Sequence, residues 1–496
     1  MVKRTRPLIE MWTVFMPRMR RFCAALFIVA TGLCGQVSAP PPLVHLYPVI
    51  LDSKGQPVTD LTTGDFKIAD QGKSQTILLF RRPAVNGAPA LEPHEYTNRP
   101  GGGTPHSIAI LFDLLNSGDA NRVDTWHSLA KSIPLLESAG QVYFYLLNLE
   151  GELVPVHPIG LEGSGDGRAW LSTFEKDLDR VMRNANLARP AGIDREDRTK
   201  RTYHQLEVVS NQLATLPGRR DIVWITNTMP TITNSFPCTG DRVECGLYVA
   251  HMVVTLDEHG VMVNPYFSSG VPEPTTSYEL EQMALLTGGH AYYLQDIREV
   301  LKQAARNATN TYEIAYAPSP ESWDNKFHKI HIACERKGVK LQVKERYYAL
   351  PDTRTDAQRQ KDALDACYQK PSDSAGIGLR VKVSPTSKGI HVEIRVDAAD
   401  LLWREQDGKF SNALTLVLSD LGASAGSGAG LLRRPVSEPS VSNINLEGSK
   451  EQYDKMTIEG ARIAFDHAVS DEVQQVRVIV MDRGTNEVGS VTFPVR

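Results

Sequence analysis

The chain has little that points to nucleic acid, to a zinc site or to repeated passage through a membrane. Its formal net charge is −4, whereas general nucleic-acid binders usually carry a basic balance. After residue 33 no apolar run is long enough to cross a bilayer. The 6 cysteines include no Cys-x-x-Cys pair, and the 13 histidines show no paired spacing typical of zinc catalysis. We therefore expect no nucleic-acid partner and no transmembrane segment once a signal is removed.

Basic residues followed by a short apolar run stand near the N-terminus. Arg18, Arg20 and Arg21 precede the apolar stretch 22–33, and Val37-Ser38-Ala39 offers small residues for cleavage. Such a stretch is typical of a secretory signal peptide and is too short to span a bilayer comfortably. We expect a signal peptide over residues 1–39 and a protein exported to the periplasm or the extracellular space. An uncleaved anchor, which would leave the protein associated with the envelope, is the alternative.

Four cysteines follow the expected signal, and this even number suits an oxidising compartment. Cys238 and Cys245 flank a short polar loop, so we expect a disulfide bond between them. Cys334 and Cys367 are then left over as a second pair, and the sequence leaves their pairing open.

The length of 496 residues favours about three domains of roughly 150 residues each. From residue 106 the pattern changes from short strands with Gly turns to strands that alternate with helices, which predicts a parallel, doubly wound sheet. The predicted order is an N-terminal β segment (40–82), a Pro/Gly-rich linker (83–105), an α/β domain (106–350), a helical linker (351–375) and a C-terminal β-sandwich domain (376–496).

Polar side chains stand at the ends of two predicted parallel strands. The apolar stretch 107–112 ends on Asp113, and a turn through Asn116 and Ser117 follows; the later stretch 222–226 ends on Asn227. In open α/β sheets, ligands bind at the carboxyl ends of the strands. We therefore expect Asp113, Asn116, Ser117 and Asn227 to line a binding crevice.

Several stretches, in a fixed order, resemble a known family. They are Val58-Thr59-Asp60-Leu61, residues 65–73, the strand and loop from 106 to 119, Leu285-Leu286-Thr287-Gly288-Gly289, residues 312–318 and Arg346-Tyr347-Tyr348. Over about residues 43–350 the chain is similar to the bacterial von Willebrand factor type A-related family of the acidobacterial type. The resemblance implies an exported protein with a von Willebrand A-like fold. Together with the strand and helix pattern above, it predicts the α/β class: a doubly wound, mostly parallel, von Willebrand A-like sheet, flanked by an N-terminal β segment and a C-terminal β-sandwich domain.

The resemblance also implies a candidate metal site. Metal-competent type A domains hold Mg²⁺ with an Asp-x-Ser-x-Ser loop, a threonine from a second loop and an aspartate after a later strand, because Mg²⁺ requires hard oxygen ligands. Asp113 and Ser117 match, whereas Leu115 and Asn227 replace a serine and the aspartate. Either Thr199 or Thr202 could supply the threonine. We expect a degenerate site with no cofactor, or at most a weakly held Mg²⁺ on Asp113, Ser117 and Asn227.

These features together favour a non-enzymatic binding protein. We expect it to contact an unknown protein or cell-envelope partner through the crevice. A metal-dependent adhesion module is the alternative. A secreted hydrolase is more distant, because Ser424 matches the G-x-S-x-G pattern but lies in a Gly/Ala/Ser loop with no helix after it.

Overall fold

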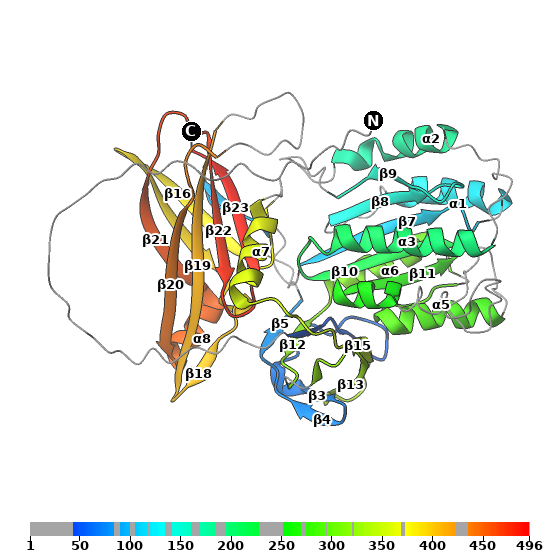
Figure 1. Cartoon of the computed structure of the whole chain (residues 1–496), viewed down its shortest axis with the longest axis horizontal. Coiled ribbons are helices and arrows are strands. Elements are labelled where there is room, and N and C mark those ends of the chain that lie inside the picture. Colours follow the sequence, from blue (N-terminus) through cyan, green and yellow to red (C-terminus); the bar gives the residue numbers. More distant parts are fainter. Residues whose placement is uncertain are drawn as a thin grey trace, which may run out of the picture. The chain divides into compact units, whose positions relative to one another are not determined.

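The computed structural model in Figure 1 describes most of the chain beyond residue 42. The described ranges are 43–83, 90–99, 105–117, 119–133, 141–159, 169–184, 195–227, 251–268, 274–293, 295–319, 322–368, 373–422 and 435–495. The expected signal peptide, the expected disulfide partners Cys238 and Cys245, and Ser424 all lie outside these residues. Within them, no helix combines the length and the apolar character needed to cross a membrane.

Strand residues outnumber helical residues in the described part of the chain, and most strands pair in antiparallel fashion. The strands form six sheets there, and parallel pairings occur in one of them. The predicted fold class, a doubly wound and mostly parallel sheet of the von Willebrand A kind, is therefore wrong for this chain. The prediction failed because strands separated by more than two hundred residues pair in antiparallel sheets, and strand–helix alternation along the chain carries no signal for such pairs.

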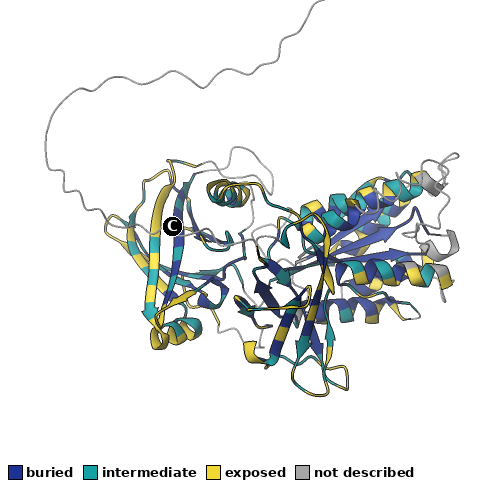
Figure 2. Cartoon of the chain, turned by 60° about the horizontal axis from the view of Figure 1, so that its bottom comes forward, coloured by how far each residue is buried: buried dark blue, intermediate teal, exposed yellow. Residues whose placement is uncertain are grey.

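The one sheet with parallel strands is mixed and has the order β11-β10-β7-β8-β9. Its three pairings from β11 to β8 are parallel, and β9 joins β8 in antiparallel orientation. The strands are β7 (His106–Asp113), β8 (Gln141–Leu147), β9 (Leu153–His157), β10 (Arg219–Thr226) and β11 (Val261–Phe267). All but β9 are almost completely buried, as the dark blue strands in Figure 2 show.

Helices cover both faces of this mixed sheet. Alternate side chains of β7 belong to different cores, because successive residues of a strand point to opposite faces: Ile110 and Phe112 lie in one, and Ala109 and Leu111 in the other. The first core also contains residues of α1 (Asp119–Ser132), α2 (Phe174–Asn184) and α6 (Ile297–Thr309), and the second contains residues of α3 (Arg195–Leu213) and α5 (Pro274–Thr287).

The N-terminal β segment is completed by strands from far along the chain. β12 (Glu313–Tyr316) lies between β1 (Val44–Leu46) and β5 (Leu79–Arg81), and β14 (Lys340–Gln342) pairs with β2 (Val49–Leu51). β13 (Phe327–Cys334) joins β15 (Arg346–Tyr348) to β3 (Phe66–Asp70), which pairs with β4 (Lys73–Gln75). The strands after residue 312 thus share a core with residues 44–68, so part of the segment predicted as an α/β domain (106–350) completes the N-terminal β sheets.

Two further antiparallel sheets share one apolar core near the C-terminus. The first contains β16 (Leu379–Thr386), β17 (Gly389–Val396), β21 (Ala461–Ala468) and β6 (Glu95–Thr97). The second contains β18 (Arg404–Gln406), β19 (Lys409–Leu421), β20 (Ser440–Ser449), β22 (Gln475–Asp482) and β23 (Val488–Pro494). α7 (Asp356–Tyr368) and α8 (Lys450–Glu459) accompany them. Because β6 belongs to this pair of sheets, the predicted linker 83–105 contributes a strand.

The leftover cysteines do not form a disulfide bond. Cys334 and Cys367 are both free thiols. Cys334 packs at the edge of the N-terminal β core, whereas Cys367 on α7 is buried against β22 and β23. The question that the sequence left open is therefore answered: the two residues belong to different cores and are not paired.

A buried charge network joins the N-terminal strands to the C-terminal sheets. The Arg81 guanidinium on β5 contacts the Glu313 carboxylate on β12 and, at 2.5 Å from its Nε, the carboxylate of Asp400. Arg99 Nη1 lies 2.6 Å from the other Asp400 oxygen. Burial would raise the pKa of Glu313, but the Arg81 charge and a hydrogen bond from His45 lower it to about 2. The network therefore keeps Glu313 ionised although its side chain is buried.

Candidate functional site

The predicted site residues lie at the carboxyl edge of the mixed sheet. Asp113 is the last residue of β7, Asn227 follows β10, and Ser268 follows β11. Because β7, β10 and β11 are neighbours and parallel, these three residues share one edge. Asp113, Asn116, Ser117 and Asn227, which we call the strand-end cluster, are all buried, with exposed fractions of 0%, 5%, 2% and 6%.

The Asp113 carboxylate accepts hydrogen bonds from the turn after β7 and from strand β10. Its Oδ1 accepts from the backbone N–H of Asn116 at 2.9 Å. Its Oδ2 accepts from Asn116 Nδ2 at 2.8 Å, from Trp224 Nε1 at 3.0 Å and from the Thr226 hydroxyl at 3.3 Å. A buried carboxylate requires such donors because water no longer solvates it. Asp113 thus fastens the turn after β7 to the neighbouring strand β10.

Burial and hydrogen bonding act in opposite directions on Asp113. Burial raises the pKa of this carboxyl above its ordinary value, and the hydrogen bonds from Asn116, Trp224 and Thr226 partly oppose the rise. The donors favour the ionised form, since each of them binds a carboxylate more strongly than a carboxylic acid. The ionised state of Asp113 consequently depends on its donors remaining in place.

The Asn116 side chain occupies the space between Asp113 and the second-loop threonine. Its Nδ2 donates to Asp113 at 2.8 Å and to Thr202 Oγ1 at 2.7 Å. The Thr202 hydroxyl in turn donates to the carbonyl of Arg198 at 2.8 Å. Of the two threonines that the sequence left open, Thr202 is therefore the one in contact with Asn116.

These residues do not fit the Mg²⁺ ion that the resemblance implies. The Asn116 NH₂ group lies between the Asp113 and Thr202 oxygens, both of which would have to coordinate the metal. A cation at that position would face the amide hydrogens, whereas Mg²⁺ requires oxygen ligands. Leu115, at the place of the missing serine, is fully buried in the apolar core. The Ser117 hydroxyl donates to the Asp113 carbonyl. In the described part of the chain, no group of three or more His, Cys, Asp or Glu residues is arranged to hold a metal ion.

Asn227 lies at the same edge but makes a different contact from the one expected of a metal ligand. Its Oδ1 accepts a hydrogen bond from the Ser268 hydroxyl. Its Nδ2 is buried and has no hydrogen-bond partner among the described residues. Buried amide groups in native proteins nearly always have a partner, so an unpaired one at a strand end requires an explanation.

Sequence reasoning missed several members of this site. Trp224, Thr226 and Ser268 were taken only as parts of strands or their ends, although each bonds to Asp113 or Asn227. The one available signal was Trp224. A buried indole N–H usually finds an acceptor, and Trp224 stands three residues before Asn227 in a strand that was predicted to be buried.

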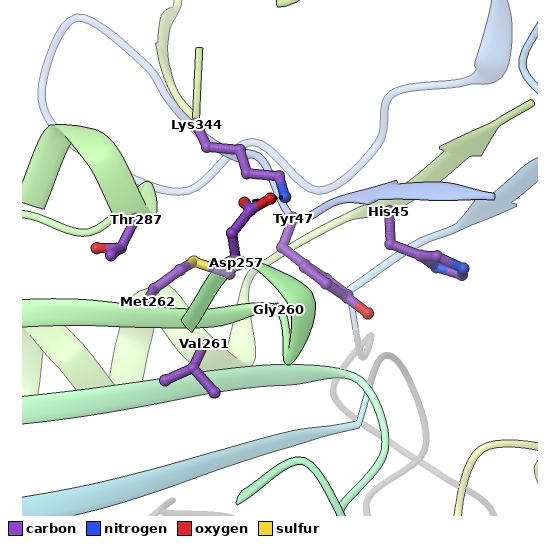
Figure 3. A pocket seen from close by; sticks show the side chains of 8 residues that line it. All are labelled: His45, Tyr47, Asp257, Gly260, Val261, Met262, Thr287 and Lys344. Atoms are coloured by element: carbon purple, nitrogen blue, oxygen red, sulfur yellow. Dashed lines mark hydrogen bonds and ion pairs between the residues drawn. The ribbon is translucent and has the colours of Figure 1, made fainter. Parts of the chain in front are cut away.

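A small cavity lies away from the strand-end cluster, where residues around β1 and β14 meet the mixed sheet. Figure 3 shows Tyr47, Met262 and Thr287 around it, with Lys344 directed at Asp257. The Lys344–Asp257 ion pair measures 2.9 Å, and Asp257 also accepts from the Tyr348 backbone N–H at 2.7 Å. The free space is about 10 Å³, which accommodates at most one water molecule. A neighbouring groove of about 950 Å³ runs past Lys344, Tyr348 and Glu487.

No protein family model matches the chain, and no curated protein matches it. Among solved structures, it is similar to human COPII-coat protein Sec24c at 10% identity and a TM-score of 0.27, covering 79% of this chain and 44% of that one. It is also similar to β-glucosidase from Listeria innocua in complex with isofagomine (11%, TM-score 0.17, 81% and 48%) and to a DUF4848 family protein from Bacteroides thetaiotaomicron (12%, TM-score 0.13, 24% and 41%). The chain spans less than half the length of each of these structures, and likenesses this weak identify neither a fold nor a function.

Proposed function

We propose that this protein is exported and binds another protein, or another component of the cell envelope, through the strand-end cluster. Binding uses direct hydrogen bonds and neither a metal ion nor a chemical reaction. The proposal of export rests on the signal-like sequence at residues 18–39.

The single observation that carries the proposal is the unpaired amide of Asn227. Its Nδ2 is buried beside the Ser268 hydroxyl and lacks a partner among the described residues. Leaving a buried donor unpaired costs about 1–3 kcal/mol, which a carbonyl or carboxylate oxygen from a bound partner would recover. In this proposal the amide donates that hydrogen bond to the partner, and because Nδ2 is buried, binding must first open a path to it.

The Asp113 network supports the same proposal because it holds the surroundings of this donor rigid. Its four hydrogen bonds tie the turn through Asn116 to Trp224 and Thr226, which directly precede Asn227 in the chain. A preorganised site loses less conformational entropy on binding. In this proposal Asp113 positions the contact surface and does not itself touch the partner.

The test is chemical cross-linking in the cells that make the protein, followed by purification through a tag. The wild-type chain should yield a cross-linked complex, and Asn227→Ala should reduce its yield about tenfold, since one buried hydrogen bond of about 1.4 kcal/mol is lost. Asn310→Ala is the matched control. Asn310 follows α6 and precedes Thr311, which contacts Arg219 at the opposite end of β10. Because Asn310 lies far from the strand-end cluster, its replacement should leave the yield of the complex unchanged. A complex that both variants retain would refute the assignment of the contact to Asn227.

A further inference from the structure

β20 is a long strand that is paired on one side. Its ten residues pair with β19 in an unbroken register from Lys409↔Ser449 to Leu418↔Ser440. No other strand of the described chain pairs with β20. Its second edge therefore presents backbone N–H and C=O groups that a further strand could bind.

This edge lacks the features that usually prevent strands from pairing across molecules. β20 contains no lysine, arginine or proline, and its only charged residue is Glu447. Other outer strands of the same two sheets differ: β21 carries Arg462 and Asp466, β18 carries Arg404 and Glu405, and β23 ends on Pro494. Proteins commonly protect sheet edges with charges, proline or bulges. β20 has none of these on ten consecutive paired residues except the one glutamate.

Exposed apolar side chains mark the same region. The two most exposed large apolar residues in the described chain are Ile458, at 85%, and Val441, at 63%. Val441 lies near the start of β20, whereas Ile458 lies near the far end of α8, nine residues after the last residue of β20. Val441 therefore places one exposed apolar side chain on the open strand itself.

We propose that β20 pairs in antiparallel fashion with β20 of a second copy of this chain, which joins two sheets into one. A two-fold axis centred at Ile444 places Asn443 opposite the partner's Asn445 and Val441 opposite the partner's Glu447. Like charges then do not meet, although both strands carry Glu447. The antiparallel arrangement also brings the exposed Val441 of each copy to the α8 end of the other, so the surface is complementary to itself, as a two-fold interface requires.

The experiment is sedimentation equilibrium of the purified chain over about a hundredfold range of concentration. The wild type should shift from monomer to dimer. The double variant Asn443→Lys/Asn445→Lys should weaken the dimer about tenfold or more, because lysines then lie directly opposite each other in two places. The control Ala464→Lys/Ala468→Lys adds the same charge at exposed positions of the protected strand β21 and should dimerise like the wild type. At a concentration low enough for all three to be monomeric, they should melt at similar temperatures.

Two results would overturn the proposal: a monomer at every concentration, or a dimer that the β20 double variant leaves intact. If the monomer also protects all β20 amides from hydrogen exchange, another segment of the same chain covers the edge.

Discussion

The side-chain amide of Asn116 donates a hydrogen bond to the Asp113 carboxylate at 2.8 Å. The same NH₂ group reaches Thr202 at 2.7 Å, so Asn116 links the turn after β7 to helix α3. Hydrogen-bond donors thus surround the Asp113 carboxylate, whose oxygens would have to be free to coordinate a metal ion. This contact is the reason why we propose that the strand-end cluster binds its partner by direct hydrogen bonds.

Asn116→Ala should destabilise the protein. The variant leaves the buried Asp113 and Thr202 oxygens without the amide donor, and each loss of this kind costs about 1–3 kcal/mol. Urea unfolding followed by circular dichroism measures the change in free energy. Asn310→Ala removes an exposed amide that bonds to the Arg306 carbonyl, and it should have little effect. Equal unfolding midpoints for the two variants would mean that Asn116 does not stabilise the cluster.

The destabilisation by Asn116→Ala should depend on pH. Burial already raises the pKa of Asp113, and loss of the Asn116 side-chain hydrogen bond should raise it further. A carboxyl whose pKa is raised in the folded state contributes stability below its unfolded pKa, and this contribution is lost as the pH rises through the folded pKa. The free-energy difference between variant and wild type should therefore shrink from about pH 7 to about pH 4. A difference that stays constant over this range would contradict the assigned role of the amide.

Arg81→Met should be severely destabilising. It leaves the buried carboxylates of Glu313 and Asp400 without the Arg81 guanidinium, and breaking a buried ion pair in this way costs about 3–5 kcal/mol. Lys361→Met, which removes an exposed ion pair with Asp365 on α7, should unfold near the wild-type midpoint. Thermal unfolding of both variants provides the comparison. If they melt together, the Arg81 network does not hold the N-terminal strands to the C-terminal sheets.

Thiol titration should find Cys334 and Cys367 reduced. Both react with an aromatic disulfide reagent in the denatured, unreduced protein, and in the native protein Cys367 should react much more slowly because it is buried. Peptide mapping then identifies the labelled positions. The same map tests the predicted Cys238–Cys245 disulfide, which requires that neither residue is labelled. Labelling confined to residues 238 and 245 would reverse both expectations.

The positions of single elements could be predicted from the sequence, but the way they pair could not. The apolar stretches at 107–112 and 222–226 were expected as strands and lie within β7 and β10. Strand pairs such as β1 with β12 join segments more than 250 residues apart. Local periodicity reports which face of a strand is buried and contains no information about its partner. The pairing of the N-terminal strands with strands after residue 312 could not be predicted for this reason.

The candidate site was predicted with the same limits. Asp113, Asn116 and Ser117 do lie together, since a strand end and the turn after it are local features. The role of Asn116 could not be predicted, because it depends on the distance to Thr202 on a helix 86 residues further along the chain. Asn227 lies at the same edge because β10 is the parallel neighbour of β7. Its hydrogen-bond partner Ser268 follows a third strand, β11, so this contact depends on a further strand pairing.

The most direct test of metal-free binding is the yield of the cross-linked complex in EDTA compared with the yield in about millimolar Mg²⁺. Direct hydrogen bonding through the strand-end cluster predicts equal yields in both conditions and the same loss with Asn227→Ala. A complex that forms only with Mg²⁺, together with a melting temperature that the ion raises, would contradict the account and would favour the metal-dependent adhesion module.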